Sequence, residues 1–275
     1  MDFAQKKIRL FDALKPLDRT LVAFSGGVDS ALVLAAALET LGPEKVLAAT
    51  AQSESLPERE LKGAAEFAAS LGAKHHILRT CETASPDYLK NSPNRCYHCK
   101  SELYTKLTEL AERENFAHIV NGVNADDLGE FRPGIQAGKE ANVISPLADA
   151  GMNKADVRRL AQEMQLPLWD KPAMACLSSR IPYGSPITTE KLSMVEQAED
   201  LLISLGFPQM RVRHHGEVAR IELPQDDLLR FFSSEAAQKA NDGLKNLGFQ
   251  FVSVDAEGFR SGKMNDALNS AQKDD

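Results

Sequence analysis

The first 165 residues alternate short apolar runs with segments of helical periodicity, and no other feature limits the fold of this chain as strongly. Alternation of this kind predicts a parallel β-sheet with helices on both faces. Ligands bind such sheets at the carboxyl ends of the strands, where the strand order reverses. After an amphipathic N-terminal helix, the expected strands are 20–24, 46–51, 76–79, 117–122 and a short fifth at 143–145, and the expected helices are 29–41, 58–71, 100–114 and 154–165.

The alternation stops between about 167 and 186, where four prolines interrupt the chain. Proline fixes φ and cannot donate a backbone hydrogen bond, so we expect an ordered loop or linker there. Beyond it we expect a helix at 188–205, a hairpin of 210–215 and 218–223, a helix at 226–247 and a strand at 251–254. The sequence therefore predicts an α/β parallel-sheet domain over residues 1–185 and a smaller α+β domain over residues 186–275, which serves substrate binding or oligomerisation.

The composition excludes several classes of protein. The formal net charge of −7 disfavours general nucleic-acid binding, because phosphate contacts need clustered Lys and Arg. The longest uninterrupted apolar run, 31–38, is far shorter than the roughly 20 residues of a membrane span. Four cysteines are too few for a disulfide scaffold, so we expect a cytoplasmic protein whose closely spaced thiols serve a metal or catalysis.

The hexapeptide SGGVDS, residues 25–30, follows the first expected strand and opens the next helix. Two glycines let the backbone approach an anion closely, and the helix N-terminus adds partial positive charge. Asp29 can also hold Mg²⁺. The simpler alternative is a turn in which Asp29 or Ser30 merely caps the helix, but the complete pattern favours phosphate binding. The candidate phosphate-binding residues are Ser25, Gly26, Gly27, Asp29 and Ser30.

The proline-rich segment contains Cys176. Lys171 and Arg180 are near it in sequence and would lower the pKa of its thiol by favouring the thiolate, which is a nucleophile or a sulfur source. A buried structural cysteine is the alternative. Next to a phosphate-binding loop, the reactive role is the better hypothesis.

Two groups of charged residues are candidates for binding an anion or a metal ion. Arg211 and Arg213 alternate on one face of an expected strand, where they form either a fork for phosphate or carboxylate or a solvated surface. Arg180 is a third candidate for anion binding and, with Cys176, a candidate catalytic residue. Asp127 and Glu199 are candidate metal ligands, or else surface carboxylates.

Cys96 and Cys99 form a C-x-x-C motif without a second half for a zinc site. They are a redox pair or, with Cys176, three ligands of a 4Fe–4S cluster whose open iron carries an extra sulfide. Cys81 fits neither arrangement and is expected to be structural.

The SGGVDS loop resembles that of the PP-loop ATP pyrophosphatases, and the resemblance extends over roughly the first 185 residues. It implies that ATP, with Mg²⁺, is cleaved between its α and β phosphates to adenylate a substrate oxygen. It also places Thr50, Gln52 and Gly122 near the nucleotide.

A closer resemblance covers nearly the whole chain. The SGGVDS loop, the segment ACLSSRIPYG, the strand residues Arg211-Val212-Arg213 and the segment GFRSG at 258–262 are together similar to the LarE family of ATP-dependent sacrificial sulfur transferases. The resemblance implies that ATP adenylates a carboxylate of pyridinium-3,5-biscarboxylic acid mononucleotide and that Cys176 attacks it. Cleavage of the Cβ–S bond then leaves a thiocarboxylate on the substrate and dehydroalanine in the chain.

The same resemblance implies a place in nickel-pincer nucleotide biosynthesis for lactate racemase, with other proteins of that biosynthesis as partners and a homo-oligomeric state. Some LarE-like proteins use three cysteines as cluster ligands instead. The sequence leaves both roles of Cys176 open and slightly favours the cluster. The alternatives are an ammonia-using synthetase of the NAD or GMP synthetase type, a tRNA-thiolating enzyme and a metal-binding module.

Overall fold

A computed structural model describes residues 1–129, 133–172, 175–260, 263 and 266. The chain divides into two compact units. The first unit comprises Met1–Glu82 and Cys96–Met174, and the second comprises Thr83–Arg95 and Ala175–Asp275. The domain boundary at 185/186 stays a prediction, whereas these compact units divide at 174/175 and assign a short earlier segment to the second unit.

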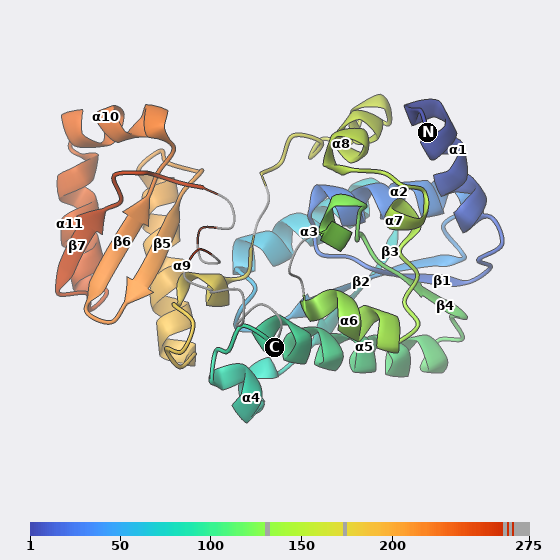
Figure 1. Cartoon of the computed structure of the whole chain (residues 1–275), viewed down its shortest axis with the longest axis horizontal. Helices are drawn as coiled ribbons and strands as arrows, with labels where there is room; N and C mark the ends of the chain where they lie inside the picture. Colours follow the sequence, from blue (N-terminus) through green and yellow to red (C-terminus); the bar gives the residue numbers. More distant parts are fainter. Residues whose placement is uncertain (130–132, 173–174, 261–262, 264–265, 267–275) are drawn as a thin grey trace. The chain divides into compact units, whose positions relative to one another are not determined.

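The first unit is built on a four-stranded parallel sheet (Figure 1). Its strands are β1 (Thr20–Ala23), β2 (Val46–Gln52), β3 (Lys74–Arg79) and β4 (His118–Val120), in the order β3-β2-β1-β4. The predicted α/β fold class is confirmed. The expected fifth strand is wrong, because only Ile144 forms a single parallel bridge, to Val120. A left-handed Asn142 precedes it and a short helix begins at Pro146, so the segment is too short for a ladder.

Helices cover both faces of this sheet, as the alternation predicts (Figure 1). Successive strand residues point to opposite faces, so Val22 and Ala48 lie in one core and Leu21 and Ala49 in the other. The first core is shared with α1 (Phe3–Leu14), α2 (Val28–Leu41), α3 (Glu58–Ser70), α7 (Pro146–Asp149) and α8 (Lys154–Glu163), and the second with α5 (Arg95–Arg113) and α6 (Pro133–Glu140).

The strand order positions the site. The chain runs from β1 to β2 and β3 on one side and then returns to place β4 on the other side of β1. The order therefore reverses between β1 and β4, where doubly wound sheets bind their ligands. The loop at 24–27 and the loop at 121–125 both leave the sheet at this point, the second of them followed by the 3₁₀ turn η2 (Asp126–Gly129).

The second unit contains a three-stranded sheet of order β5-β6-β7. The hairpin of β5 (Arg211–His215) and β6 (Val218–Glu222) is confirmed, with Gly216 in the left-handed region at φ 65°. Val212 and Ile221 face a core shared with the helices, so Arg211 and Arg213 face the opposite side. The remaining elements are η1 (Glu82–Ala84), which begins in the first unit, α4 (Pro86–Leu89), η3 (Leu177–Arg180), α9 (Thr189–Ser204), capped by Thr188, α10 (Gln225–Ser233), α11 (Ala236–Asn246) and β7 (Phe251–Val254).

The single helix expected at 226–247 is wrong. Ser234 is extended, with φ −114° and ψ 175°, and separates α10 from α11. Its hydroxyl accepts the N–H of Ala236 and donates to the carbonyl of Phe231. Serine side chains compete in this way with helical backbone hydrogen bonds, so Ser234 ends the helix. The amphipathic pattern nevertheless continues across this break, which is why the sequence suggested one helix. In the described part of the chain, no helix is long and apolar enough to span a membrane.

Candidate nucleotide and cysteine sites

The hexapeptide 25–30 forms a tight loop between β1 and α2. Gly26 has φ 74°, and a Cβ there would lie 3.1 Å from the Cβ of Ala64. Both the left-handed backbone and the close contact favour glycine at this position. Gly27, not Asp29 or Ser30, is the N-cap, and no side chain caps the helix. The first-turn N–H groups of α2 therefore remain available to an anion.

The two serines of this loop brace it from within. The Ser30 hydroxyl donates to the Gly27 carbonyl at 3.1 Å and accepts the Ser25 N–H at 3.1 Å. The two hydroxyl oxygens lie 3.0 Å apart. In the structure the two hydroxyls fix the shape of the loop. Hydrogen bonds from them to phosphate stay a prediction.

Gly122, at the end of β4, supports the start of α2. A Cβ at this position would lie 2.6 Å from the Ser30 nitrogen and 2.9 Å from the Asp29 carbonyl carbon. Only glycine lets the two loops approach this closely. The structure thus gives Gly122 a packing role against the start of α2, and its place near the nucleotide stays a prediction.

Asp29 faces a second acidic loop across the switch point. Its Oδ1 accepts the side-chain N–H of Asn124 at 2.9 Å, and the Asn124 backbone N–H donates to Asp127 Oδ2 at 3.2 Å. Burial raises the pKa of Asp29 above its usual value, and the Asp127 carboxylate adds to this effect. Lys154 Nζ lies 3.7 Å from Asp127 Oδ1. Mg²⁺ is commonly held by one or two carboxylates together with substrate phosphates, and these two carboxylates fit that pattern.

Thr50 and Gln52 differ in their surroundings. Thr50 is 1% exposed, and its hydroxyl donates to the Phe24 carbonyl at 2.8 Å, so it must accept from His75 Nε2, 2.8 Å away. Burial lowers the pKa of His75. Thr50 therefore fixes the end of β1, while Gln52 is exposed at the carboxyl end of β2. Their contact with the nucleotide stays a prediction.

Sequence reasoning assigned Lys171 to the thiol, but its ammonium lies at the phosphate loop. Its Nζ donates to the Gly26 carbonyl at 3.0 Å and pairs with Glu60 at 2.7 Å. Asn124 was missed altogether. The only sequence signal that Asn124 belongs to the site was its position four residues after β4. No local sequence signal places Lys171 at the phosphate loop, because its partners Gly26 and Glu60 are more than 100 residues away.

In the second unit, Cys176 is the N-cap residue of η3 and is half-buried. Its carbonyl oxygen accepts three hydrogen bonds, from the Ser179 N–H at 3.0 Å, the Ser179 hydroxyl at 2.8 Å and Arg180 at 3.1 Å. Tyr88 hydrogen-bonds Ser178, and Arg95 donates to the Ser178 carbonyl at 2.9 Å. The backbone that carries the thiol is therefore firmly held.

Arg180 is fully buried, and its counter-ion is Glu199, which is also fully buried, at 2.8 Å. The guanidinium donates to the carbonyl of Ala175 at 2.7 Å as well as to that of Cys176. Glu199 additionally lies 3.3 Å from the Val212 N–H. These contacts describe a positioning role for Arg180, and the expected role of Glu199 as a metal ligand stays a prediction.

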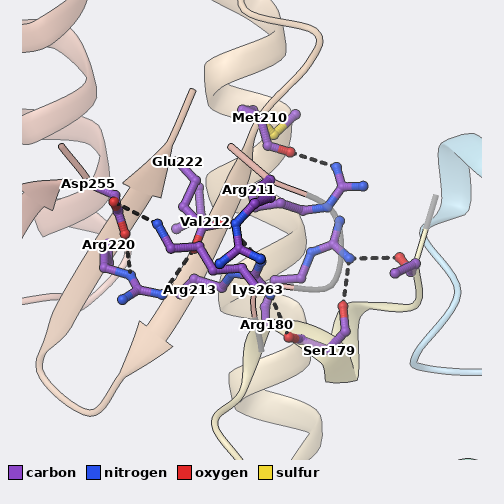
Figure 2. Close-up of polar contacts among 12 residues, drawn as sticks. Ser179, Arg180, Met210, Arg211, Val212, Arg213, Arg220, Glu222, Asp255 and Lys263 are labelled. Carbon is purple, nitrogen blue, oxygen red and sulfur yellow. Dashed lines mark hydrogen bonds and ion pairs between the residues drawn. The ribbon is translucent and has the colours of Figure 1, made fainter. Parts of the chain in front are cut away.

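Arg211 and Arg213 lie on the face of the β5–β6 hairpin opposite the core (Figure 2). Arg213 pairs with the buried Glu222 at 2.7 Å and donates to the Ser179 carbonyl at 2.8 Å, while its buried Nε has no acceptor among the described residues. The Arg211 guanidinium carbon lies 4.9 Å from the centre of the Phe259 ring. Burial and the nearby Arg180 charge lower the pKa of Arg211 to about 10.

The same face carries the ion pairs of Arg220 with Glu222 and of Lys263 with Asp255, at 3.0 and 2.8 Å (Figure 2). This hairpin therefore presents several cations whose acidic partners are mostly buried. Of the segment 258–262, Ser261 and Gly262 lie outside the described residues.

Cys96 and Cys99 lie in the first turns of α5, three residues apart on one side of the helix. Cys96 is exposed and Cys99 is half-buried. Within the part of the chain that the structure describes, no group of three or more His, Cys, Asp or Glu side chains is arranged to hold a metal ion.

Comparison with known proteins identifies the family. Residues 18–98 match the family model described as asparagine synthase. The chain is 43% identical over 270 residues to the pyridinium-3,5-bisthiocarboxylic acid mononucleotide synthase of Lactiplantibacillus plantarum, which covers 98% of this chain and 97% of that protein.

Two proteins without an assigned function are also similar. One from Synechocystis sp. is 46% identical over 252 residues, 92% of this chain and 94% of that protein. One from Methanocaldococcus jannaschii is 31% identical over 264 residues, 95% of this chain and 100% of that protein. Because the similarity to the synthase runs through both units, the chain belongs to the LarE family of the PP-loop superfamily.

Proposed function

We propose that this protein is an ATP-dependent sulfur transferase that converts a carboxylate of pyridinium-3,5-biscarboxylic acid mononucleotide into a thiocarboxylate in nickel-pincer nucleotide biosynthesis. The observation that carries the proposal is the uncapped start of α2 behind the glycine loop, with Asp29 at its first turn. This is a phosphate site without the lysine of a Walker loop, as adenylating PP-loop enzymes have.

The first unit supplies the adenylation half. The N–H groups after Gly27 bind the phosphates that leave as pyrophosphate, and Asp29 and Asp127 are the residues that would hold Mg²⁺. Mg²⁺, when bound, neutralises phosphate charge during attack on the α-phosphorus. The substrate carboxylate oxygen attacks that phosphorus, the bond to the β-phosphate oxygen breaks, and an acyl adenylate forms.

The second unit supplies the anion-binding and sulfur half. A phosphorylated dicarboxylate needs a basic surface, and the Arg211 and Arg213 face offers charge-assisted and bidentate hydrogen bonds. The acceptor-free Nε of Arg213 supports this role. Carboxylate oxygen is a poor leaving group and AMP is a good one, so only the adenylate lets a thiolate displace it.

Cys176 is the proposed thiol. Its sulfur attacks the acyl carbon, AMP departs, and a thioester forms. Loss of the Cα proton and cleavage of the Cβ–S bond then leave the sulfur on the substrate and dehydroalanine at position 176. Arg180 and Ser179 hold the Cys176 carbonyl and so orient the backbone for this elimination.

The 4Fe–4S alternative rests on Cys96, Cys99 and Cys176. Cys96 and Cys99 belong to the first unit and Cys176 to the second, and we derive no step through a cluster. A cytoplasmic location, a homo-oligomeric state and other proteins of the nickel-pincer biosynthesis as partners complete the proposal.

The test is a single-turnover reaction of protein purified without oxygen, with Mg²⁺, ATP and the biscarboxylate. We expect AMP and pyrophosphate, a thiocarboxylate product and the loss of one H₂S from the intact chain at Cys176. Cys176→Ala should still form AMP but no thiocarboxylate, whereas Cys81→Ala, which removes an exposed thiol, should behave as the wild type. ADP and phosphate as products would contradict the proposal. Bound iron with repeated turnover on added sulfide would replace the sacrificial route with the cluster.

A further inference from the structure

Lys171 holds its ammonium group against the phosphate loop. Nζ donates to the Gly26 carbonyl at 3.0 Å and to Glu60 at 2.7 Å. The side chain is 26% exposed and that of Glu60 is 13% exposed, so the pair is largely sheltered. An ammonium has three N–H donors, and the described residues take two of them.

The segment before Lys171 is fixed from α8. Arg158 donates to the carbonyl of Trp169 at 3.0 Å and to that of Lys171 at 2.8 Å. The Lys171 N–H donates in turn to the Leu168 carbonyl at 3.0 Å. These bonds hold the Lys171 backbone and leave its four-carbon side chain to extend to Gly26.

The charge balance of the loop explains why a cation belongs there. The triphosphate of ATP is strongly anionic, yet the hexapeptide SGGVDS contains no Lys or Arg and contributes the acidic Asp29. A Walker loop meets the same need with a lysine inside its own motif. Lys171 brings a compact, strongly hydrated cation to the same place from 145 residues away.

From this geometry we propose that Lys171 binds the phosphates of ATP in the loop, and that Glu60 neutralises it when no nucleotide is bound. The ammonium exchanges the Gly26 carbonyl for a phosphate oxygen and keeps Glu60 as its second partner. The inference rests on the proposed function, since it adds the phosphate cation of that same nucleotide site.

The test compares affinities measured by titration calorimetry for Mg²⁺–ATP and for adenosine. Hydrogen bonds to charged groups contribute about 1.5–3 kcal/mol, so Lys171→Ala should weaken ATP binding by about tenfold or more while adenosine binding stays unchanged. Lys171→Arg should keep more ATP affinity than Lys171→Ala. Glu60→Gln keeps a hydrogen-bond acceptor for Lys171 but removes a negative charge that neutralises the ammonium, so it should tighten ATP binding.

The matched control is Lys45→Ala, which removes an exposed lysine paired at 2.6 Å with Asp18, at the amino end of β2. It should leave both affinities unchanged. The intrinsic fluorescence of Trp169, the only tryptophan, reports whether each variant is folded and how it unfolds.

Three outcomes would overturn the proposal: unaltered ATP affinity in Lys171→Ala, a parallel loss of adenosine binding, or a loss of ATP affinity in Glu60→Gln. The last two would mean that the ion pair serves only the fold. ATP cleavage to ADP by the wild type would instead refute the proposed function and leave the affinity comparison to decide the role of Lys171.

Discussion

A methyl group added at Gly122 tests whether the contact between the β4 loop and the start of α2 shapes the nucleotide site. The new Cβ would lie 2.6 Å from the Ser30 nitrogen, whereas ordinary contact begins at 3.4 Å. The first turn of α2 must therefore retreat by about 3.4 − 2.6 = 0.8 Å. The atoms in the way belong to the backbone, so no side chain can rotate to relieve the clash.

The clash should lower both the stability of the protein and the rate of adenylation. Overpacking of a close contact costs about 1–3 kcal/mol of unfolding free energy, which lowers Tm by about 2–4 °C per kcal/mol in a chain of this size. A displacement near 1 Å in an active site slows the chemical step by as much as about 100-fold. Gly122→Ala should therefore form AMP far more slowly than its modest loss of stability would suggest.

The assay measures the rate of AMP formation and the denaturation midpoint on the same preparation. Gly63→Ala is the matched control, because Gly63 lies inside α3 with no atom within 4 Å of the added Cβ. It should gain about 0.5–1 kcal/mol of stability and keep the wild-type rate. A Gly122→Ala protein with unaltered rate and midpoint would show that the two loops are not in contact, and the reasoning would fail.

Three further changes probe the charged groups. In Asp29→Asn, the amide can still accept from Asn124, but the carboxylate is gone. Burial raises the pKa of Asp29, so the folded chain holds this proton more tightly than the unfolded chain and loses stability as pH rises from 3.8 through the raised pKa. Without metal, the Asp29→Asn variant should therefore be more stable than the wild type at neutral pH and equally stable at pH well below 3.8. It should also bind Mg²⁺–ATP weakly. Denaturation curves that show equal stability of the two proteins at every pH would refute the predicted stability difference. Arg211→Gln should weaken binding of the anionic substrate by about tenfold or more without changing ATP binding, and the wild-type affinity should fall as pH rises through about 10, where Arg211 loses its proton; calorimetry showing unaltered substrate affinity would remove Arg211 from the site. Glu199→Gln leaves the buried charge of Arg180 without its counter-ion and should cost about 3–5 kcal/mol; a denaturation midpoint equal to that of the wild type would contradict it.

The parallel sheet and the tight loop at 25–30 were predictable because local sequence patterns determine both. Strands buried on both faces read as short apolar runs, and a loop such as 25–30 needs its glycines at fixed offsets. The same local signal failed at Ser234, where a side-chain hydrogen bond ends α10 while the amphipathic pattern continues. It also failed at 143–145, where too few residues separate Asn142 from Pro146.

The partners of the charged residues were not predictable. Lys171 meets Gly26 across 145 residues, and proximity in sequence suggested Cys176 instead. Asn124 meets Asp29 across 95 residues. Such pairings depend on strand order and crossover connections, which a single sequence does not encode locally. Only the tertiary structure shows which cation neutralises which carboxylate.

The Arg180–Glu199 pair connects the two features of the second unit that the proposed sulfur step needs. Arg180 donates to the carbonyls of Ala175 and Cys176, which flank the Cα of Cys176, while Glu199 lies within 3.3 Å of the Val212 N–H. Val212 lies between the two arginines proposed to bind substrate. One buried ion pair therefore sets both the backbone that carries the thiol and the strand that carries the anion site.

A buried ion pair rarely adds stability over an apolar pair of the same size, and its better-supported use is to specify one arrangement. That view separates two variants. Replacing Arg180 and Glu199 together by Met and Leu should leave the second unit folded, since no charge is stranded. It should still slow thiocarboxylate formation, because the Ala175 carbonyl loses the Arg180 donor and the Cys176 carbonyl loses one of its three donors. AMP formation, which depends on Gly122 and the loop of the first unit, should continue at the wild-type rate. A double variant that forms thiocarboxylate normally would show that the pair serves stability alone.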